Sequence, residues 1–204
     1  METLFSIIIL IFSVVIHEVA HGYAALQFGD STARYAGRLT LNPIAHIDWF
    51  GSVLLPLLLV LSHAGFVIGW AKPVPVNPYN FSHRRLGEGV VAAAGPLANL
   101  LLALCFGLLI RFIGPTLALP ASFIDLAAIV VITNIVLAVF NLLPLPPLDG
   151  SKILFTILPN RFSRLRDGLE RQGIFLVLIF IFFFWQTIYP LVPFLFSLIT
   201  GFHL

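Results

Sequence analysis

The sequence predicts an all-α integral membrane protein, a polytopic helix bundle. Hydrophobic residues make up 59% of its 204 residues, charged residues make up only 10%, and the mean hydropathy is +1.04. A soluble domain is about a quarter charged, so this chain lacks the polar surface that water requires. Apolar segments of about 20 residues, the length that crosses a bilayer, also recur along the chain. A lipid bilayer is therefore the expected surrounding.

The charged residues exclude one other class of protein. The eleven Lys and Arg residues give a formal net charge of only +2. They are too few and too scattered for a nucleic-acid surface, so no nucleic-acid partner is expected. The single cysteine, Cys105, excludes an internal disulfide framework and a cysteine-based metal site.

The first apolar segment, residues 4–28, is predicted to be a helix that stays in the membrane. The chain starts with Glu2 and no early Lys or Arg, and it continues into HEVAHGYAALQF, unlike a secretory signal peptide. Residues 89–113 and 123–143 are predicted to be further spans. Residues 173–204 form one further helix or two, because Pro190 and Pro193 interrupt them.

Two connecting segments are expected to be small extended elements. Residues 35–41 alternate roughly as a strand does. Pro73, Pro75 and Pro78 require an extended backbone, because proline fixes φ and restricts the residue before it. No repeat or low-complexity linker is visible, so the chain is interpreted as one membrane-embedded domain, 1–204. Its motif-bearing core covers 1–152, and a charged loop with an apolar helix or helices covers 153–204.

The first apolar helix contains His17, Glu18 and His21 in the pattern H-E-x-x-H. Residues four apart lie on one face of a helix, so both imidazoles can reach a single zinc ion, with Glu18 beside it to handle a proton. Ionisable groups at bilayer depth are costly unless they are paired or bound to a metal. Three of them in an apolar helix therefore indicate a metal site.

A catalytic zinc keeps three protein ligands, so a third ligand must come from elsewhere in the chain. The Asp and His candidates are Asp30, Asp48, Asp125, Asp149, His46, His63 and His83. Asp149 stands out because the segment NLLPLPPLDG ends an apolar helix with three prolines and then presents a carboxylate. The alternative is that these prolines merely end a span and that Asp149 caps the next helix.

These motifs together resemble the site-2 protease (M50) family of intramembrane zinc metalloproteases, in particular its minimal members without a PDZ domain. HEVAH is similar to the zinc motif of that family, and NLLPLPPLDG is similar to its N-x-x-P-x-P-x-x-D-G motif. AAAGPLANL resembles the G-x-x-x-N element through Gly95 and Asn99. GRLTLNP and GWAKPVPVNP resemble loops of the compact subgroup. One departure is Trp49, where the pattern has a proline.

The resemblance implies a metalloendopeptidase with one zinc ion, ligated by His17, His21 and Asp149, and with Glu18 as the catalytic residue. It also implies that Asn141 lies in the active-site region, where Asn141 and Asn99 are candidate substrate-binding residues. The structural alternative for residues 92–99 is close helix packing through small side chains.

A shared zinc ion restricts the topology, because its ligands must lie at the same depth. The His17–His21 pair lies roughly 24 Å along the first helix from Met1, and Asp149 follows the end of segment 123–143. The helices at 4–28 and 123–143 must therefore run parallel. If residues 51–69 and 89–113 both spanned, those helices would be antiparallel instead.

Residues 51–69 are the weaker span and are predicted to form a re-entrant hairpin. They contain Pro56 and Gly65, and the polar Ser62 and His63 lie near the middle. The re-entrant arrangement places ten Lys and Arg residues on one side of the membrane and only Arg111 on the other. By the positive-inside rule, the zinc site then lies nearer the cytosolic face of the cell membrane.

The predicted function is zinc-dependent hydrolysis of peptide bonds in transmembrane substrates, within or near the bilayer. A membrane ion or metal transporter is the alternative, because intramembrane His, Glu and Asp residues also mark ion pathways. A transporter would space its polar residues along a path, whereas here they collect on two helices. An inactive membrane scaffold is a third hypothesis, which the presence of Glu18 disfavours.

Overall fold

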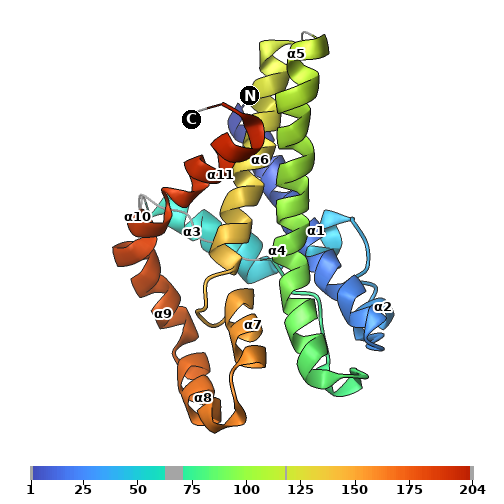
Figure 1. The fold of residues 1–204 in the computed structure, drawn as a ribbon. Helices are drawn as coiled ribbons and strands as arrows, with labels where there is room; N and C mark the ends of the chain where they lie inside the picture. Colours follow the sequence, from blue (N-terminus) through green and yellow to red (C-terminus); the bar gives the residue numbers. More distant parts are fainter. Residues whose placement is uncertain (1, 63–70, 118, 203–204) are drawn as a thin grey trace.

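Three long apolar helices form the centre of the protein (Figure 1). The computed structural model describes residues 2–62, 71–117 and 119–202, and within these residues it contains helices and no strand. Each of the three is long and apolar enough to cross a membrane. They are α1 (Glu2–Gln27), α4 (Arg84–Leu108, continued by the π-helical turn η4, Leu109–Ile113) and α6 (Ala121–Asn141). The predicted all-α membrane class is confirmed, although α4 begins earlier than expected.

The central helix is α4, which packs against α1, α6 and α7. Figure 1 shows that α1 and α6 run in the same general direction along the bundle and that α4 runs in the opposite direction. The parallel arrangement predicted for α1 and α6 is therefore present. Small side chains let these helices approach closely, since Ala103, Ala127 and Ala138 are almost completely buried between them.

The segment between α1 and α4 leaves and returns at the same end of the bundle. The Ser82 N–H donates to the Phe28 carbonyl oxygen at 2.9 Å, which joins the end of α1 to the start of α4. The segment between α1 and α4 contains α2 (Thr32–Tyr35), η1 (Pro43–His46), η2 (Trp49–Leu54), α3 (Leu55–Leu61) and η3 (Pro78–Asn80).

The geometry of this segment is what a re-entrant hairpin requires. A helix over Trp49–Leu61 is about 20 Å long, too short to cross the roughly 30 Å hydrocarbon core. The rest of the predicted hairpin, 63–70, lies outside the described residues and includes His63. Its re-entrant character stays a prediction.

The strand predicted over residues 35–41 is wrong. Tyr35 ends α2, and the following N–H groups fold back, Gly37 to the Arg34 carbonyl at 3.0 Å and Arg38 to the Ala33 carbonyl at 2.9 Å. These N–H groups therefore form the hydrogen bonds of a turn and not those of a β-strand. Residues 71–77, in contrast, carry no helical structure and lie extended, as their prolines predict.

The short helix α5 (Gly114–Leu117) precedes α6, and the residues after α6 form a series of short helices. They are α7 (Asp149–Ile157), η5 (Asn160–Phe162), α8 (Ser163–Arg171), α9 (Gly173–Ile179), η6 (Phe180–Phe184), α10 (Trp185–Ile188) and α11 (Leu191–Thr200). The chain bends by 70° between α8 and the helix Gly173–Ile188. A break follows at Tyr189 and Pro190, in agreement with the interruption predicted at Pro190, whereas Pro193 lies in the first turn of α11 and does not interrupt it.

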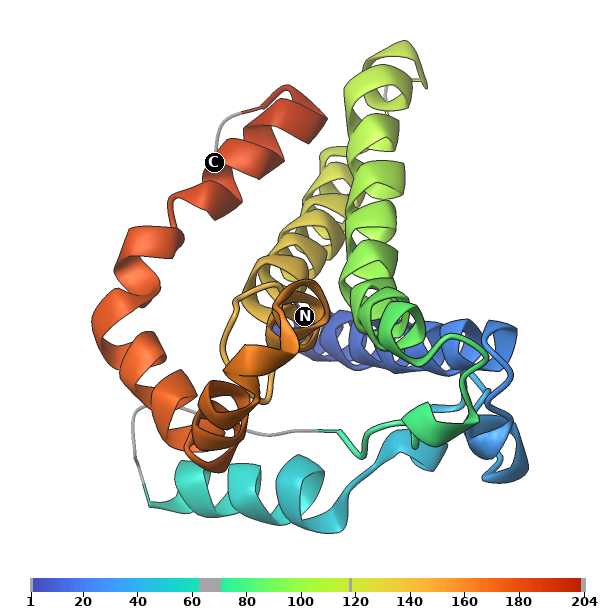
Figure 2. The ribbon, with the colours of Figure 1, turned by 60° about the horizontal axis from the view of Figure 1, so that its bottom comes forward.

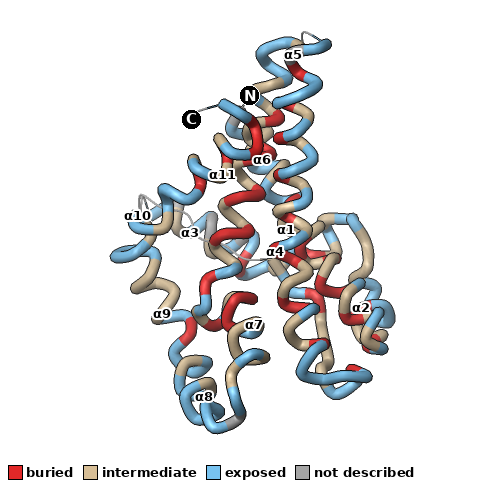
Figure 3. The backbone as a smooth tube through the Cα atoms, in the orientation of Figure 1, coloured by how far each residue is buried: buried red, intermediate tan, exposed pale blue. Residues whose placement is uncertain are grey.

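Burial differs sharply within this series. Val192, Phe196 and Ile199 of α11 pack into the apolar core with α4 and α6. Gly173 is the only buried residue described in α9, and η6 and α10 have none (Figure 3). In Figure 2 the helices from α8 to α11 form an arc beside the centre. The division into a core at 1–152 and a C-terminal part at 153–204 stays a prediction.

Asp30 joins the end of α1 to the proline-rich loop. It is fully buried, and its carboxylate accepts hydrogen bonds from the Asn77 N–H at 2.7 Å, the Asn80 side-chain amide at 2.8 Å and Thr32. Burial alone would raise the pKa of Asp30, but these hydrogen bonds outweigh it and lower the pKa below its ordinary value. The ionised carboxylate therefore stabilises the folded loop.

We expect Asp30→Asn to lower the thermal midpoint of the purified protein by several degrees, because it removes a charged acceptor of several hydrogen bonds. Because the pKa of Asp30 is lower in the folded protein, its ionised carboxylate contributes its full stabilisation above the unfolded-state pKa of about 3.8. This contribution is lost as the pH falls through the lower pKa of the folded state. The gap between wild type and variant should thus narrow below pH 3.8. Asp167→Asn, at an exposed carboxylate of α8, is the control. An equal midpoint for Asp30→Asn and wild type at neutral pH would contradict this role.

Candidate metal centre

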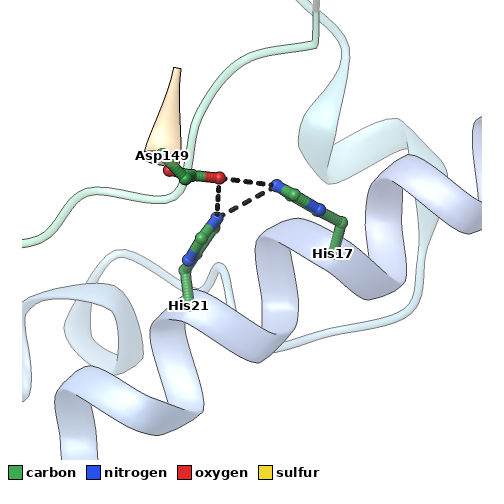
Figure 4. Close-up of side chains that lie close together, drawn as sticks. All are labelled: His17, His21 and Asp149. Carbon is green, nitrogen blue, oxygen red and sulfur yellow. Dashed lines mark hydrogen bonds and ion pairs between the residues drawn. The ribbon is translucent and has the colours of Figure 1, made fainter. Parts of the chain in front are cut away.

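Three side chains converge between α1 and α7 (Figure 4). The Nε2 atoms of His17 and His21 lie 3.1 Å apart, and each lies 3.1 Å from Oδ2 of Asp149. All three residues are buried. His17 and His21 are one turn apart on the same face of α1, and Asp149 is the first residue of α7. Within the described residues this is the only cluster of His, Cys, Asp and Glu that could hold a metal ion.

The NLLPLPPLDG segment places the carboxylate of Asp149. It ends α6 at Asn141 and restarts a helix at Asp149, so the chain turns back between α6 and α7. Gly150 packs against the backbone carbonyls of Leu142 and Leu143 more closely than any Cβ atom would allow. The Asp149 carboxylate faces the imidazoles and Lys152, whose Nζ lies 3.2 Å from Oδ1. A role for Asp149 only as a helix cap is thus disfavoured.

The hydrogen bonds of the two histidines suit the binding of a cation. His21 Nδ1 lies 2.6 Å from the Val91 carbonyl oxygen, and His17 Nδ1 lies 2.6 Å from Oδ1 of Asn99. Both oxygens are acceptors, so each Nδ1 carries the proton and each Nε2 presents a lone pair. Two lone pairs and a carboxylate oxygen then face one another at 3.1 Å.

Three facing acceptors repel one another unless a cation lies among them. Tetrahedral zinc at 2.0–2.1 Å from each ligand separates the ligand atoms by about 3.3 Å, close to the spacing present here. Two neutral imidazoles and one carboxylate are also the ligand types of catalytic zinc sites. The residues present therefore fit zinc.

Gly95 of α4 creates the space for both imidazoles. A Cβ atom at this position would lie 2.5 Å from Nε2 of His21 and 2.6 Å from Nε2 of His17. Any larger residue would push the imidazoles apart or displace α4. The small-residue packing predicted for this element is therefore present, and the side chains that it accommodates are those of the site itself.

Glu18 lies beside the cluster on a cavity of about 510 Å³. His17, His21 and Asp149 line the same cavity, and so do residues of the extended loop. Oε2 of Glu18 accepts a hydrogen bond from the Val74 N–H at 2.8 Å. The extended loop thus lines the cavity and fixes one oxygen of Glu18, a long-range contact that no local pattern in the sequence predicts.

The other candidate ligands lie elsewhere. Asp30 is bonded to the proline-rich loop, Asp48 accepts from the Gly51 N–H at 2.7 Å at the start of η2, and Asp125 is exposed on α6. His46 is buried against the Thr40 carbonyl oxygen, and His83 is exposed before α4. His63 lies outside the described residues.

The two asparagine candidates occupy different positions. Asn141 lines the cavity, and its side-chain amide donates to the Leu137 carbonyl oxygen at 3.0 Å. Asn99 is fully buried behind His17 and is not among the residues that line the cavity. Sequence reasoning included Asn99 but did not find Asn134, which bonds to it. Asn134 is a polar residue in an apolar span, and that was the available signal.

Comparisons with known proteins identify the family. The family described as Peptidase family M50 matches residues 116–185. YwhC of Bacillus subtilis, whose name describes a candidate zinc metalloprotease, is 43% identical over 179 residues, which cover 84% of this chain and 78% of YwhC. The chain belongs to peptidase family M50.

Two more distant relatives agree with this membership. Rip2 of Mycolicibacterium smegmatis is 34% identical over 169 residues, which cover 82% of this chain but only 62% of Rip2. MJ0611 of Methanocaldococcus jannaschii is 30% identical over 159 residues, 74% of this chain and 72% of MJ0611. Both names also describe candidate zinc metalloproteases. No solved structure gives a significant match.

Membership of the M50 family confirms the predicted class of activity. The protein is a membrane metalloendopeptidase, a zinc-dependent intramembrane protease, and the transporter alternative is not favoured. The roles of individual residues are a separate question, which the geometry of this chain must answer.

We expect Gly95→Ala to reduce the zinc content of the purified protein well below one equivalent, because the added methyl group collides with both imidazoles. Gly107→Ala is a matched control in the same helix, since its methyl group would collide with Ile199 of α11, away from the site. The control should lower the thermal midpoint and retain zinc. Full zinc content in Gly95→Ala would show that α4 does not restrict the site.

Proposed function

We propose that this M50 protease cleaves transmembrane protein substrates within or at the edge of the bilayer. In this proposal His17, His21 and Asp149 hold one zinc ion per chain, and Glu18 is the general base. The observation that carries the proposal is the convergence of three metal-binding atoms and the Glu18 carboxylate on one cavity, about 9 to 15 Å along α1 from its end at Gln27.

The catalytic roles follow from the donor and acceptor atoms. Zinc, when bound, activates a water molecule and polarises the scissile carbonyl. The Val74 N–H fixes Oε2 of Glu18, which leaves Oε1 to take a proton from water and to pass it to the leaving amine. Lys152 pairs with Asp149 Oδ1 and keeps Oδ2 directed at the imidazoles.

Substrate binding is proposed along the extended loop. A transmembrane helix hides its carbonyls in hydrogen bonds, so a substrate must unwind before it is cleaved. Pro73, Val74, Val76 and Pro78 line the cavity, and an unwound segment can lie against this stretch as an added strand. Asn141, on the same cavity, is placed to hydrogen-bond the substrate backbone.

The outer end of the cavity is charged. Glu88 pairs with Arg84 at 3.0 Å, and Arg166 pairs with Glu170 at 2.8 Å. These four residues line the cavity with Lys152, so this end is expected to face water and polar residues that flank a substrate helix.

We propose that this end faces the cytosol and that the protein is a multi-pass protein of the cell membrane. Arg84 and Arg85 begin α4 at the same end as the site, whereas Arg111 lies at the opposite end and bonds to the Leu198 carbonyl oxygen at 2.8 Å. The ten-to-one distribution of Lys and Arg then satisfies the positive-inside rule.

We expect Glu18→Gln to abolish proteolysis while leaving zinc bound, because it removes the proton acceptor and no ligand. Asp149→Ala is the matched variant and should lose both activity and zinc. Each purified protein is incubated with a panel of single-span proteins, cleavage is mapped by mass spectrometry, and zinc is measured on the same sample. Activity of Glu18→Gln close to wild type would mean that another residue is the base. Undiminished zinc in Asp149→Ala would move the third ligand elsewhere.

The proposed orientation predicts the accessibility of two loops in intact cells. In a Cys105→Ser background, single cysteines replacing Ser31 and Ser82 should both react only with membrane-permeant reagents, because both loops face the cytosol. Ser31 follows α1 and Ser82 precedes α4, so they report the two sides of segment 51–69. Labelling of Ser82→Cys but not Ser31→Cys by an impermeant reagent would show that this segment spans.

A further inference from the structure

Asn134 is a buried polar residue in the middle of α6, outside the catalytic cavity. It is completely buried, as is Asn99 on α4, and neither lines the cavity. An amide in an apolar interior costs several kcal/mol unless its donors and acceptor are hydrogen-bonded. The partners of Asn134 therefore indicate what the residue does.

The hydrogen bonds of Asn134 connect three helices. Its side-chain Nδ2 donates to the Val130 carbonyl oxygen and to Oγ of Ser13, both at 2.9 Å. Its Oδ1 accepts from Nδ2 of Asn99 at 2.8 Å. Nδ2 of Asn99 also lies 3.3 Å from the Ser13 carbonyl oxygen. The opposite end of the Asn99 amide, Oδ1, faces His17 Nδ1 at 2.6 Å.

These hydrogen bonds form a series from Val130 through Asn134 and Asn99 to His17, and the Val130 carbonyl sets the direction of each of them. The Val130 carbonyl can only accept, so Asn134 must turn its NH₂ group toward it and its oxygen toward Asn99. Asn99 must then turn its NH₂ group toward Asn134 and its oxygen toward His17, and the longer bond to the Ser13 carbonyl favours the same orientation. An oxygen cannot donate, so the His17 proton must lie on Nδ1 and the lone pair on Nε2.

His21 has the same tautomer as His17, but a single direct hydrogen bond sets it. Its Nδ1 donates directly to the Val91 carbonyl oxygen, which needs no further orientation. His17 has an amide as its partner, and an amide can turn either end toward an imidazole. The tautomer of His17 therefore depends on a second residue in a way that the tautomer of His21 does not.

We infer that Asn134 is a positioning residue for the metal site: through Asn99 it fixes the tautomer of His17 and directs the Nε2 lone pair of His17 toward the zinc ion. Asn134 touches neither the metal site nor the cavity, and its effect passes through Asn99. The inference rests on the proposed role of His17 as a zinc ligand. Partners that orient a ligating histidine typically change metal affinity by 10–100-fold when they are removed.

The first measurement is the zinc dissociation constant of the full-length protein in detergent, by competition with a chelator. Leucine has the same branched arrangement of side-chain heavy atoms as asparagine but no amide, so Asn134→Leu removes the hydrogen bonds, and it should raise this constant about 10-fold. Thr200→Val is the matched control, because Thr200 is also buried and bonds to a backbone carbonyl, that of Phe196 at 2.8 Å, but on α11. The control should bind zinc as wild type does, and thermal midpoints of the metal-free proteins check that each variant folds.

The second measurement separates positioning from packing. Asn99→Ala removes the amide that links Asn134 to His17, so zinc binding in this variant no longer depends on Asn134. Adding Asn134→Leu to Asn99→Ala should therefore cause no further rise in the zinc dissociation constant. A packing role would instead give the same loss of affinity with either residue at position 99.

Two results would overturn the inference: wild-type zinc affinity in Asn134→Leu, or an equal loss of affinity when Asn134→Leu is added to the wild type and to Asn99→Ala. His17→Ala, measured in parallel, tests the ligand assignment on which the inference rests. If His17→Ala loses zinc and Asn134→Leu does not, the positioning role fails and the proposed function stands. If His17→Ala keeps its zinc, the ligand assignment itself fails.

Discussion

The structure depends on one constraint: three atoms with lone pairs must meet at a single point inside an apolar bundle. His21 and Asp149 are 128 residues apart in sequence, yet their side chains lie 3.1 Å apart. Buried ionisable groups are costly at membrane depth, so such a meeting point is stable only with a bound cation and with partners for every remaining polar atom. The parallel course of α1 and α6, the turn between α6 and α7, and the gap provided by Gly95 all satisfy this constraint.

Helix α4 contributes no ligand and nevertheless organises the site. Its Gly95 lets the imidazoles approach, its Val91 carbonyl and Asn99 side chain orient them, and its first turn holds α7. Arg85 donates to the carbonyl oxygens of Thr156, Ile157 and Leu158 at the C-terminal end of α7, at 2.6 to 3.3 Å. These carbonyls have no partner within the helix, so Arg85 satisfies them and fixes the helix that carries Asp149. The position of α4 thus determines how the His17–His21 pair and Asp149 lie in the proposed metal centre.

The proline-rich loop links the site to the water-facing end of the bundle. Proline has no N–H, so this stretch has few backbone donors. Two of them bind carboxylates of the first helix and its continuation, Val74 to Glu18 and Asn77 to Asp30. A third, from Lys72, bonds to the His46 carbonyl oxygen at 2.9 Å. These three N–H groups hold the loop in place, and Pro73, Val74, Val76 and Pro78 of the same stretch line the cavity.

The sequence alone determined the membrane class, the three long spans and the helix face that carries His17 and His21. It also singled out Asp149 among the candidates for a third metal ligand. These features depend on hydrophobicity, helical spacing and proline, which act over a few residues and are therefore visible in a sequence. The tertiary structure decided that 35–41 form a turn, that Asn99 lies behind His17, that the Val74 N–H donates to Glu18, and that Asn134 accepts from Asn99. Each of these depends on which hydrogen-bonding partner a distant segment supplies, and that partner is set by the packing and rotation of whole helices.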